Sequence, residues 1–101
     1  MQTTQEIWIL VVEVLVEPGD LPSGSTRAFT TITTWAESAQ EAQEKLSAYL
    51  DTFNWKVLEV EQVQRYSDAE TYQESLIEMI EQTKGNPQAI ILGEFHTYKP
   101  E

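Results

Sequence analysis

The chain has 101 residues, 41% of them hydrophobic, and its 17 acidic and six basic residues give a formal net charge of -11. This length fits a single α+β domain spanning 1–101, and the composition excludes the polar, low-complexity class of disordered chains. The negative charge removes the main electrostatic attraction to nucleic acids and anionic membranes, so we expect neither as a partner.

Cysteine is absent, which excludes disulfides, thiolate chemistry and zinc sites built on cysteine. The sequence starts MQTTQE, without basic residues, and Glu13 interrupts the apolar run that follows. This pattern is not typical of a secretory signal or of a membrane-spanning helix. We therefore expect a cytoplasmic protein.

Residues 7–16, IWILVVEVLV, predict a β-strand that is apolar on both faces. Side chains alternate between the two faces of an extended chain. One face carries Trp8, Leu10, Val12, Val14 and Val16, and the other carries Ile7, Ile9, Val11, Glu13 and Leu15. A surface strand of an antiparallel sheet is normally polar on one side, so this strand needs a cover on each face.

A loop and a second strand follow. Two prolines and two glycines within residues 17–25, EPGDLPSGS, predict the loop. Residues 26–35, TRAFTTITTW, are rich in β-branched and aromatic side chains, which predicts a strand antiparallel to the first. Its many threonines favour an edge position in the sheet.

The first helix is predicted to begin after Ser38, because Ser38 and Glu41 have the spacing of a capping box. Its apolar stripe consists of Ala39, Ala42, Leu46, Tyr49, Leu50 and Phe53. Asn54 can end this helix in the left-handed conformation. Residues 55–66, WKVLEVEQVQRY, then predict a third strand, with a bulge near 59–62 where the alternation breaks.

A second capping box, Ser67 with Glu70, predicts a second helix that Gly85 and Pro87 end. Its apolar stripe consists of Ala69, Tyr72, Leu76, Met79, Ile80 and Thr83. Residues 88–99, QAIILGEFHTYK, predict the fourth strand because they are β-rich and apolar at their start.

We therefore expect an α+β fold with the chain order ββαβαβ, built as two layers from a mixed four-stranded sheet and two helices. Numbering strands by sequence, the order 2-1-3-4 places both helices on one face of the sheet, and 2-1-4-3 places them on opposite faces. The polar third strand favours the second order. The lengths of the elements resemble those of two-layer, ferredoxin-like folds and favour the first, which we prefer.

One group of residues could support acid–base chemistry. Glu94, His96 and Tyr98 alternate along the fourth strand and so share a face, where the carboxylate would orient the imidazole. A polar cluster on a strand explains the same residues without catalysis. We therefore expect no enzyme activity and no cofactor. The calcium-loop spacing D-x-D-x-D-G is also absent, so we expect no metal.

The acidic residues are more regular. Glu70, Glu74, Glu78 and Glu81 are spaced to line one side of the second helix. A solvated helix face is the simpler interpretation, and a docking surface for a basic protein partner is the alternative.

These features favour a small, non-enzymatic protein-protein interaction or regulatory module. The alternatives are an acidic inhibitor or decoy that occupies a basic, nucleic-acid-binding surface, and a small enzyme that uses Glu94, His96 and Tyr98. One helical layer leaves the second face of the first strand uncovered, and monomers rarely expose large apolar patches. We therefore expect a homodimer whose interface contains Ile7, Ile9, Val11 and Leu15.

Overall fold

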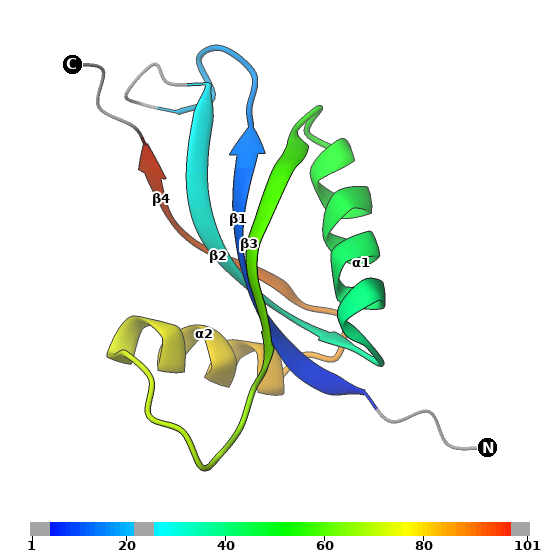
Figure 1. The fold of residues 1–101 in the computed structure, drawn as a ribbon, viewed down its shortest axis with the longest axis vertical. Coiled ribbons are helices and arrows are strands. Elements are labelled where there is room, and N and C mark those ends of the chain that lie inside the picture. The colour runs from blue at the N-terminus through cyan, green and yellow to red at the C-terminus, as the bar shows by residue number, and fades with distance from the viewer. Residues whose placement is uncertain (1–4, 22–25, 98–101) are drawn as a thin grey trace.

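The computed structural model describes residues 5–21 and 26–97, and the α+β class and the chain order ββαβαβ are confirmed (Figure 1). The elements are β1 (Glu6–Leu15), β2 (Arg27–Ala36), α1 (Ala39–Asp51), β3 (Lys56–Arg65), α2 (Glu74–Lys84) and β4 (Ile90–Thr97). Neither helix is long and apolar enough to span a membrane, judged on these described residues.

The strands form one sheet in the order β3-β1-β2-β4, and every neighbouring pair is antiparallel. This differs from the mixed sheet and from both strand orders that we expected. The connection through α1 carries the chain across β1, so β2 and β3 run in the same direction without becoming neighbours. The connection through α2 then leads from one edge of the sheet to the other.

The two helices pack on opposite faces of β1. Leu10, Val12 and Val14 point toward α1, where the buried residues are Ala42, Leu46 and Leu50. Ile7 and Ile9 form a second buried cluster with Ile80 of α2. The structure therefore has a helix on each face of the sheet instead of the expected two layers, and β1 is apolar on both sides because each side meets a helix.

β2 lies inside the sheet and not at its edge, although its threonines suggested otherwise. Their hydroxyls are buried with partners: Thr34 Oγ1 donates to the Ala89 carbonyl oxygen at 3.1 Å, and Thr30 Oγ1 donates to the Gly93 carbonyl oxygen at 3.3 Å. A buried threonine whose hydroxyl is hydrogen-bonded carries little penalty, so threonine composition does not identify an edge strand here.

Several local predictions are confirmed. Ser38 caps α1, since its hydroxyl accepts a hydrogen bond from the Glu41 amide at 3.1 Å. Asn54 adopts a left-handed conformation with φ of 62° after the helix. The register between β1 and β3 shifts twice, which leaves Glu61 and Leu58 without a partner in β1 and places a bulge inside the predicted segment 59–62.

Candidate functional site

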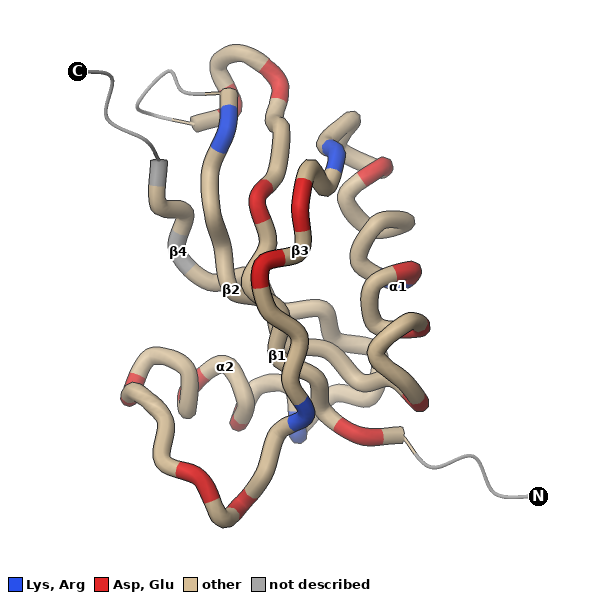
Figure 2. The backbone as a smooth tube through the Cα atoms, viewed as in Figure 1, with Lys and Arg blue, Asp and Glu red and all other residues tan. Residues whose placement is uncertain are grey.

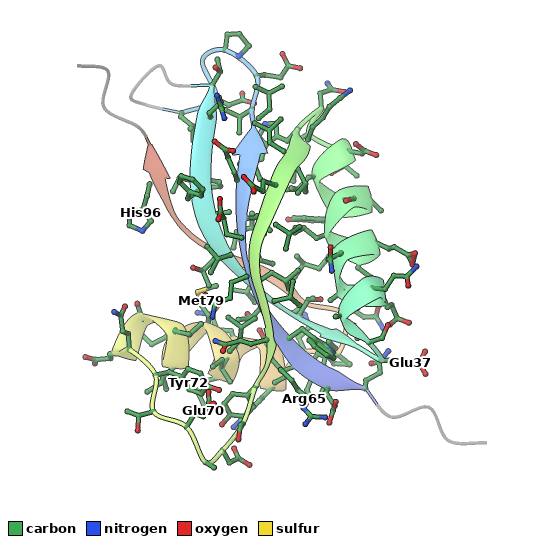
Figure 3. The ribbon with its side chains drawn as sticks, in the orientation of Figure 1. Glu37, Arg65, Glu70, Tyr72, Met79 and His96 are labelled. Atoms are coloured by element: carbon green, nitrogen blue, oxygen red, sulfur yellow. The ribbon has the colours of Figure 1, made fainter. Side chains whose placement is uncertain are left out.

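A hollow of about 530 Å³ lies beside α2, where the first turns of the helix, the middle of β4 and one residue of β2 meet. Two of its lining residues, Met79 and His96, are labelled in Figure 3. Its apolar lining comes from Leu76, Met79, Leu92 and Gly93. Its polar lining comes from Thr31, Gln73, Ser75, Glu78 and His96. Ligand-binding sites are typically concave and mainly apolar, with a few polar groups. This hollow is concave but more polar than that, because its lining is divided about equally between polar and apolar groups.

The hollow exists because α2 is anchored near one end of the sheet only. Trp35 Nε1 donates to the Thr83 carbonyl oxygen at 2.6 Å, and the hydroxyls of Thr33 and Thr83 lie 2.7 Å apart. These contacts fix the C-terminal half of the helix against β2. The first turns of α2 continue toward β4, and the hollow lies beneath them.

Gly93 sets the depth of the hollow. The register between β2 and β4 shifts at this point, between Thr30 and Ile32. A Cβ atom at Gly93 would lie 3.1 Å from the Met79 sulfur and 3.2 Å from the Thr31 carbonyl oxygen, both closer than ordinary van der Waals contact. Glycine therefore allows the Met79 side chain to lie against the β4 backbone, and a larger residue would push it into the hollow.

The predicted acidic stripe is shorter than the sequence suggested. Glu74, Glu78 and Glu81 lie exposed on α2, but the helix begins only at Glu74, so Glu70 belongs to the preceding loop. Glu70 accepts a hydrogen bond from the Tyr72 hydroxyl at 3.2 Å, and Glu81 lies 3.9 Å from the Lys84 amine. Glu78 is the member of the stripe that lines the hollow.

The loop before α2 explains the wrong helix start. The Ser67 hydroxyl accepts from the Ala69 amide at 3.2 Å, and the Glu70 amide donates to the Ser67 carbonyl oxygen at 3.2 Å, so these residues close a turn. The Ser67 amide donates to the Tyr72 hydroxyl at 3.0 Å. This side-chain contact holds the segment outside the helix, which begins after Gln73 without a side-chain cap.

A smaller hollow of about 270 Å³ lies against Tyr66, Tyr72 and Ile80. The two tyrosine rings are 5.6 Å apart, and the Lys84 amine lies 4.9 Å from the centre of the Tyr66 ring. The hydrogen bond from the Tyr66 hydroxyl to Asp68 raises the pKa of Tyr66, and the hydrogen bond from Lys84 to Tyr66 raises the pKa of Lys84. This tyrosine pair is thus already in contact with a cation of the protein itself, the Lys84 amine.

Of the predicted acid–base group, only the His96 side chain lies within the described part of the chain. His96 is exposed, lines the hollow beside α2 and pairs in register with Phe29 (Figure 3). The Glu94 side chain and Tyr98 lie outside the described residues. Among the side chains that are described, no group of three or more histidines and carboxylates could hold a metal ion.

The predicted dimer surface is largely internal. Ile7 and Ile9 are 4% and 2% exposed because α2 covers them, so they cannot form a surface between subunits. Val11 is half-buried, and Leu15 is 37% exposed. The reason for expecting an interface at Ile7 and Ile9 was a missing second cover, and α2 supplies it.

The sequence analysis missed an ion pair that involves a buried carboxylate. Glu13 is buried on β1, and its carboxylate accepts a hydrogen bond from Arg27 of β2 at 2.8 Å. Glu59 lies opposite Glu13 in the register of β3, and its negative charge is the largest cause that raises the pKa of the neighbouring Glu61. The sequence signal for the ion pair was that Glu13 and Arg27, which have opposite charges, lie on either side of the loop 17–25.

The acidic residues of the described chain are spread over β1, α1, β3, α2 and the loops instead of gathering on one element (Figure 2). No family model matches the chain, and no significant match is found among curated proteins or solved structures.

Proposed function

We propose that the protein is a non-enzymatic binding module that receives a basic, partly apolar segment of another protein in the hollow beside α2. The observation that supports this most directly is the combination of an apolar floor, made by Leu76 and Met79, with the Glu78 carboxylate at its side. Methionine is flexible and polarisable, which suits it to receive side chains of different shapes.

The charge of the chain favours a basic partner. A net charge of -11 attracts cations over the whole surface, and Glu74 and Glu78 concentrate that attraction beside the hollow. The apolar floor then provides the burial that long-range charge cannot provide. A segment that alternates apolar and basic side chains satisfies both requirements, since one set enters the hollow and the other meets the carboxylates.

A decoy that imitates a nucleic acid would need its carboxylates on one continuous face. The acidic residues of the described chain are distributed over several helices, strands and loops (Figure 2), so we prefer local docking. A homodimer remains a separate prediction, with Val11 and Leu15 as the accessible part of the expected interface. A cytoplasmic location likewise remains a prediction, which cell fractionation would test.

The test uses a synthetic peptide of alternating lysine and valine, with the glutamate–valine peptide as its control. The chain has two methionines, Met1 and Met79, so labelling the methionine methyl groups gives a direct reporter in the hollow. The lysine peptide is expected to shift the Met79 methyl signal, which Met79→Leu identifies by its disappearance. The glutamate peptide is expected to leave it unchanged.

Two charge reversals separate local docking from general attraction. Glu78→Lys alters the side of the hollow, and Glu44→Lys makes the same change of charge on the exposed surface of α1. Glu78→Lys is expected to weaken binding several-fold more than Glu44→Lys. Equal weakening by both variants, or a Met79 signal that the lysine peptide does not move, would contradict the proposal.

A further inference from the structure

The sheet has two edges, β3 and β4, and they differ in how they are protected. Each pairs with one neighbour only within the described residues, β3 with β1 and β4 with β2. An edge strand presents unpaired amide and carbonyl groups, which can pair with another chain unless charges, bulges or a cover prevent it.

β3 has two such protections. Its register against β1 shifts at two places, and the unpaired residues are Glu61 and Leu58. Charged residues also occur along its whole length, at Lys56, Glu59, Glu61 and Arg65. Bulges and alternating charges are the usual means by which proteins prevent pairing at an edge.

β4 has less of this protection. Its register against β2 shifts once, at Gly93 and Glu94, where the register of β3 shifts twice. It runs for eight residues, IILGEFHT, and Glu94 is the only acidic or basic residue in that sequence apart from His96. Ile91, Leu92 and Phe95 are half-buried, so the strand already has apolar neighbours on which an added strand could continue the packing. Among the described residues, β4 is therefore the edge that is more open to another strand.

The open edge adjoins the hollow. Leu92, Gly93 and His96 of β4 line it together with Gln73 and Ser75 from the start of α2. Side chains of a strand alternate between the two faces of a sheet. A strand added to β4 would therefore direct every second side chain to the face on which α2 and the hollow lie.

We propose that the basic segment binds as a fifth strand along the free edge of β4, with alternate side chains directed toward the hollow beside α2. This inference rests on the proposed function and specifies the conformation of the bound segment. Backbone hydrogen bonds to β4 would supply affinity, and the hollow and Glu78 would select the side chains, as in other cases of strand addition.

The negative charge of the chain indicates that the added strand comes from a partner protein and not from β4 of a second copy of this chain. Two copies would bring together two chains that each carry a net charge of -11, and this repulsion opposes their association. A basic strand offsets the same charges, which is the reason for choosing it as the occupant.

The decisive experiment removes backbone donors from the lysine–valine peptide without changing its side chains. One derivative carries N-methyl groups at the lysines and the other carries them at the valines. Only one of the two sets of amides faces β4 in an added strand. One derivative is therefore expected to lose at least about tenfold in affinity while the other stays close to the parent peptide.

The outcomes distinguish this inference from the function on which it rests. A parent peptide that binds, with two N-methylated derivatives of equal affinity, would overturn strand addition and leave the binding function intact. A parent peptide that does not move the Met79 signal would overturn both.

Hydrogen exchange provides a second measurement on the protein itself. The parent peptide is expected to slow exchange at alternate amides of β4, with the amides of the other edge, β3, as the matched control. Protection of β3 instead of β4 would overturn the assignment of the edge. Amides of β4 that are already protected in a self-associated chain would show that a second copy is the occupant.

Discussion

The hydroxyl oxygens of Thr33 and Thr83 lie 2.7 Å apart in the interior, where β2 meets α2. Thr83 Oγ1 also donates to the Met79 carbonyl oxygen at 2.8 Å. Its single proton is used in that bond, so Thr33 is the donor between the two threonines. The pair is therefore asymmetric, although its members are the same residue type.

This asymmetry predicts unequal effects of the two valine substitutions. Thr83→Val leaves the buried Thr33 hydroxyl without an acceptor, and we expect a loss of about 1 to 3 kcal/mol in the free energy of unfolding. Thr33→Val leaves the Thr83 proton bonded to Met79, so its cost should be smaller. The double variant should cost less than the sum of the two, and chemical denaturation of the four proteins measures this coupling.

Ile9→Lys tests the position of α2. Ile9 is 2% exposed and packs in a cluster with Ile80, so a lysine there buries a charge without a partner. Because domains of this size are stable by only about 5 to 15 kcal/mol, we expect this variant to unfold. Circular dichroism of Ile9→Lys checks this, and Leu15→Lys is the exposed control. If Ile9→Lys is folded and monomeric, Ile9 lies on the surface.

The two serines at apparent capping boxes should behave differently. Ser38→Ala removes the hydroxyl that accepts from the Glu41 amide, and we expect a loss of about 0.5 to 2 kcal/mol. Ser67→Ala removes a contact in an exposed turn outside α2 and should cost less. Denaturant melts of both variants are the measurement, and a larger loss from Ser67→Ala would place the start of α2 at Ser67.

Acidification should relieve repulsion on β3. The charge of Glu59, followed by the loss of hydration, raises the pKa of Glu61 above its ordinary value of 4.5. The folded chain therefore holds this proton more strongly than the unfolded chain, and the ionised group destabilises the fold at pH values above the raised pKa. This penalty decreases as the pH falls through the raised pKa, and it is absent below 4.5.

Glu61→Gln should consequently be more stable than the wild type at pH 7, with a difference that disappears on acidification below pH 4.5. High salt should also reduce the difference, because both carboxylates are near solvent. Thermal melts at several pH values measure the effect, with Glu44→Gln on α1 as the control. A variant that is less stable at pH 7 would show that Glu61 has a favourable partner.

Features that depend on neighbouring residues were predictable from the sequence. The Ser38 cap, the left-handed Asn54 and the bulge in β3 each follow from a short motif or a break in alternation. The second capping box failed because the Tyr72 hydroxyl, which lies beyond the motif, bonds the Ser67 amide and keeps the segment out of the helix. A local motif was overridden by a contact that the motif does not contain.

The strand order and the hollow depend on residues far apart in the chain. The apolar character of both faces of β1 correctly indicated two covers, but sequence alone did not show that α2 is the second. The hollow requires the register shift that places Gly93 beside Met79, together with the delayed start of α2 at Glu74. Neither is encoded in a periodic pattern.

The central position of β1 has a consequence for the nascent chain. β1 is made early, but one of its edges waits for β3, and the cover over Ile7 and Ile9 is complete only after Lys84. A ribosome-bound chain that ends before α2 would therefore expose a strand and an apolar surface together, which is the combination that promotes aggregation. The nascent chain is therefore expected to be most prone to aggregation in the interval before α2 emerges and packs on Ile7 and Ile9.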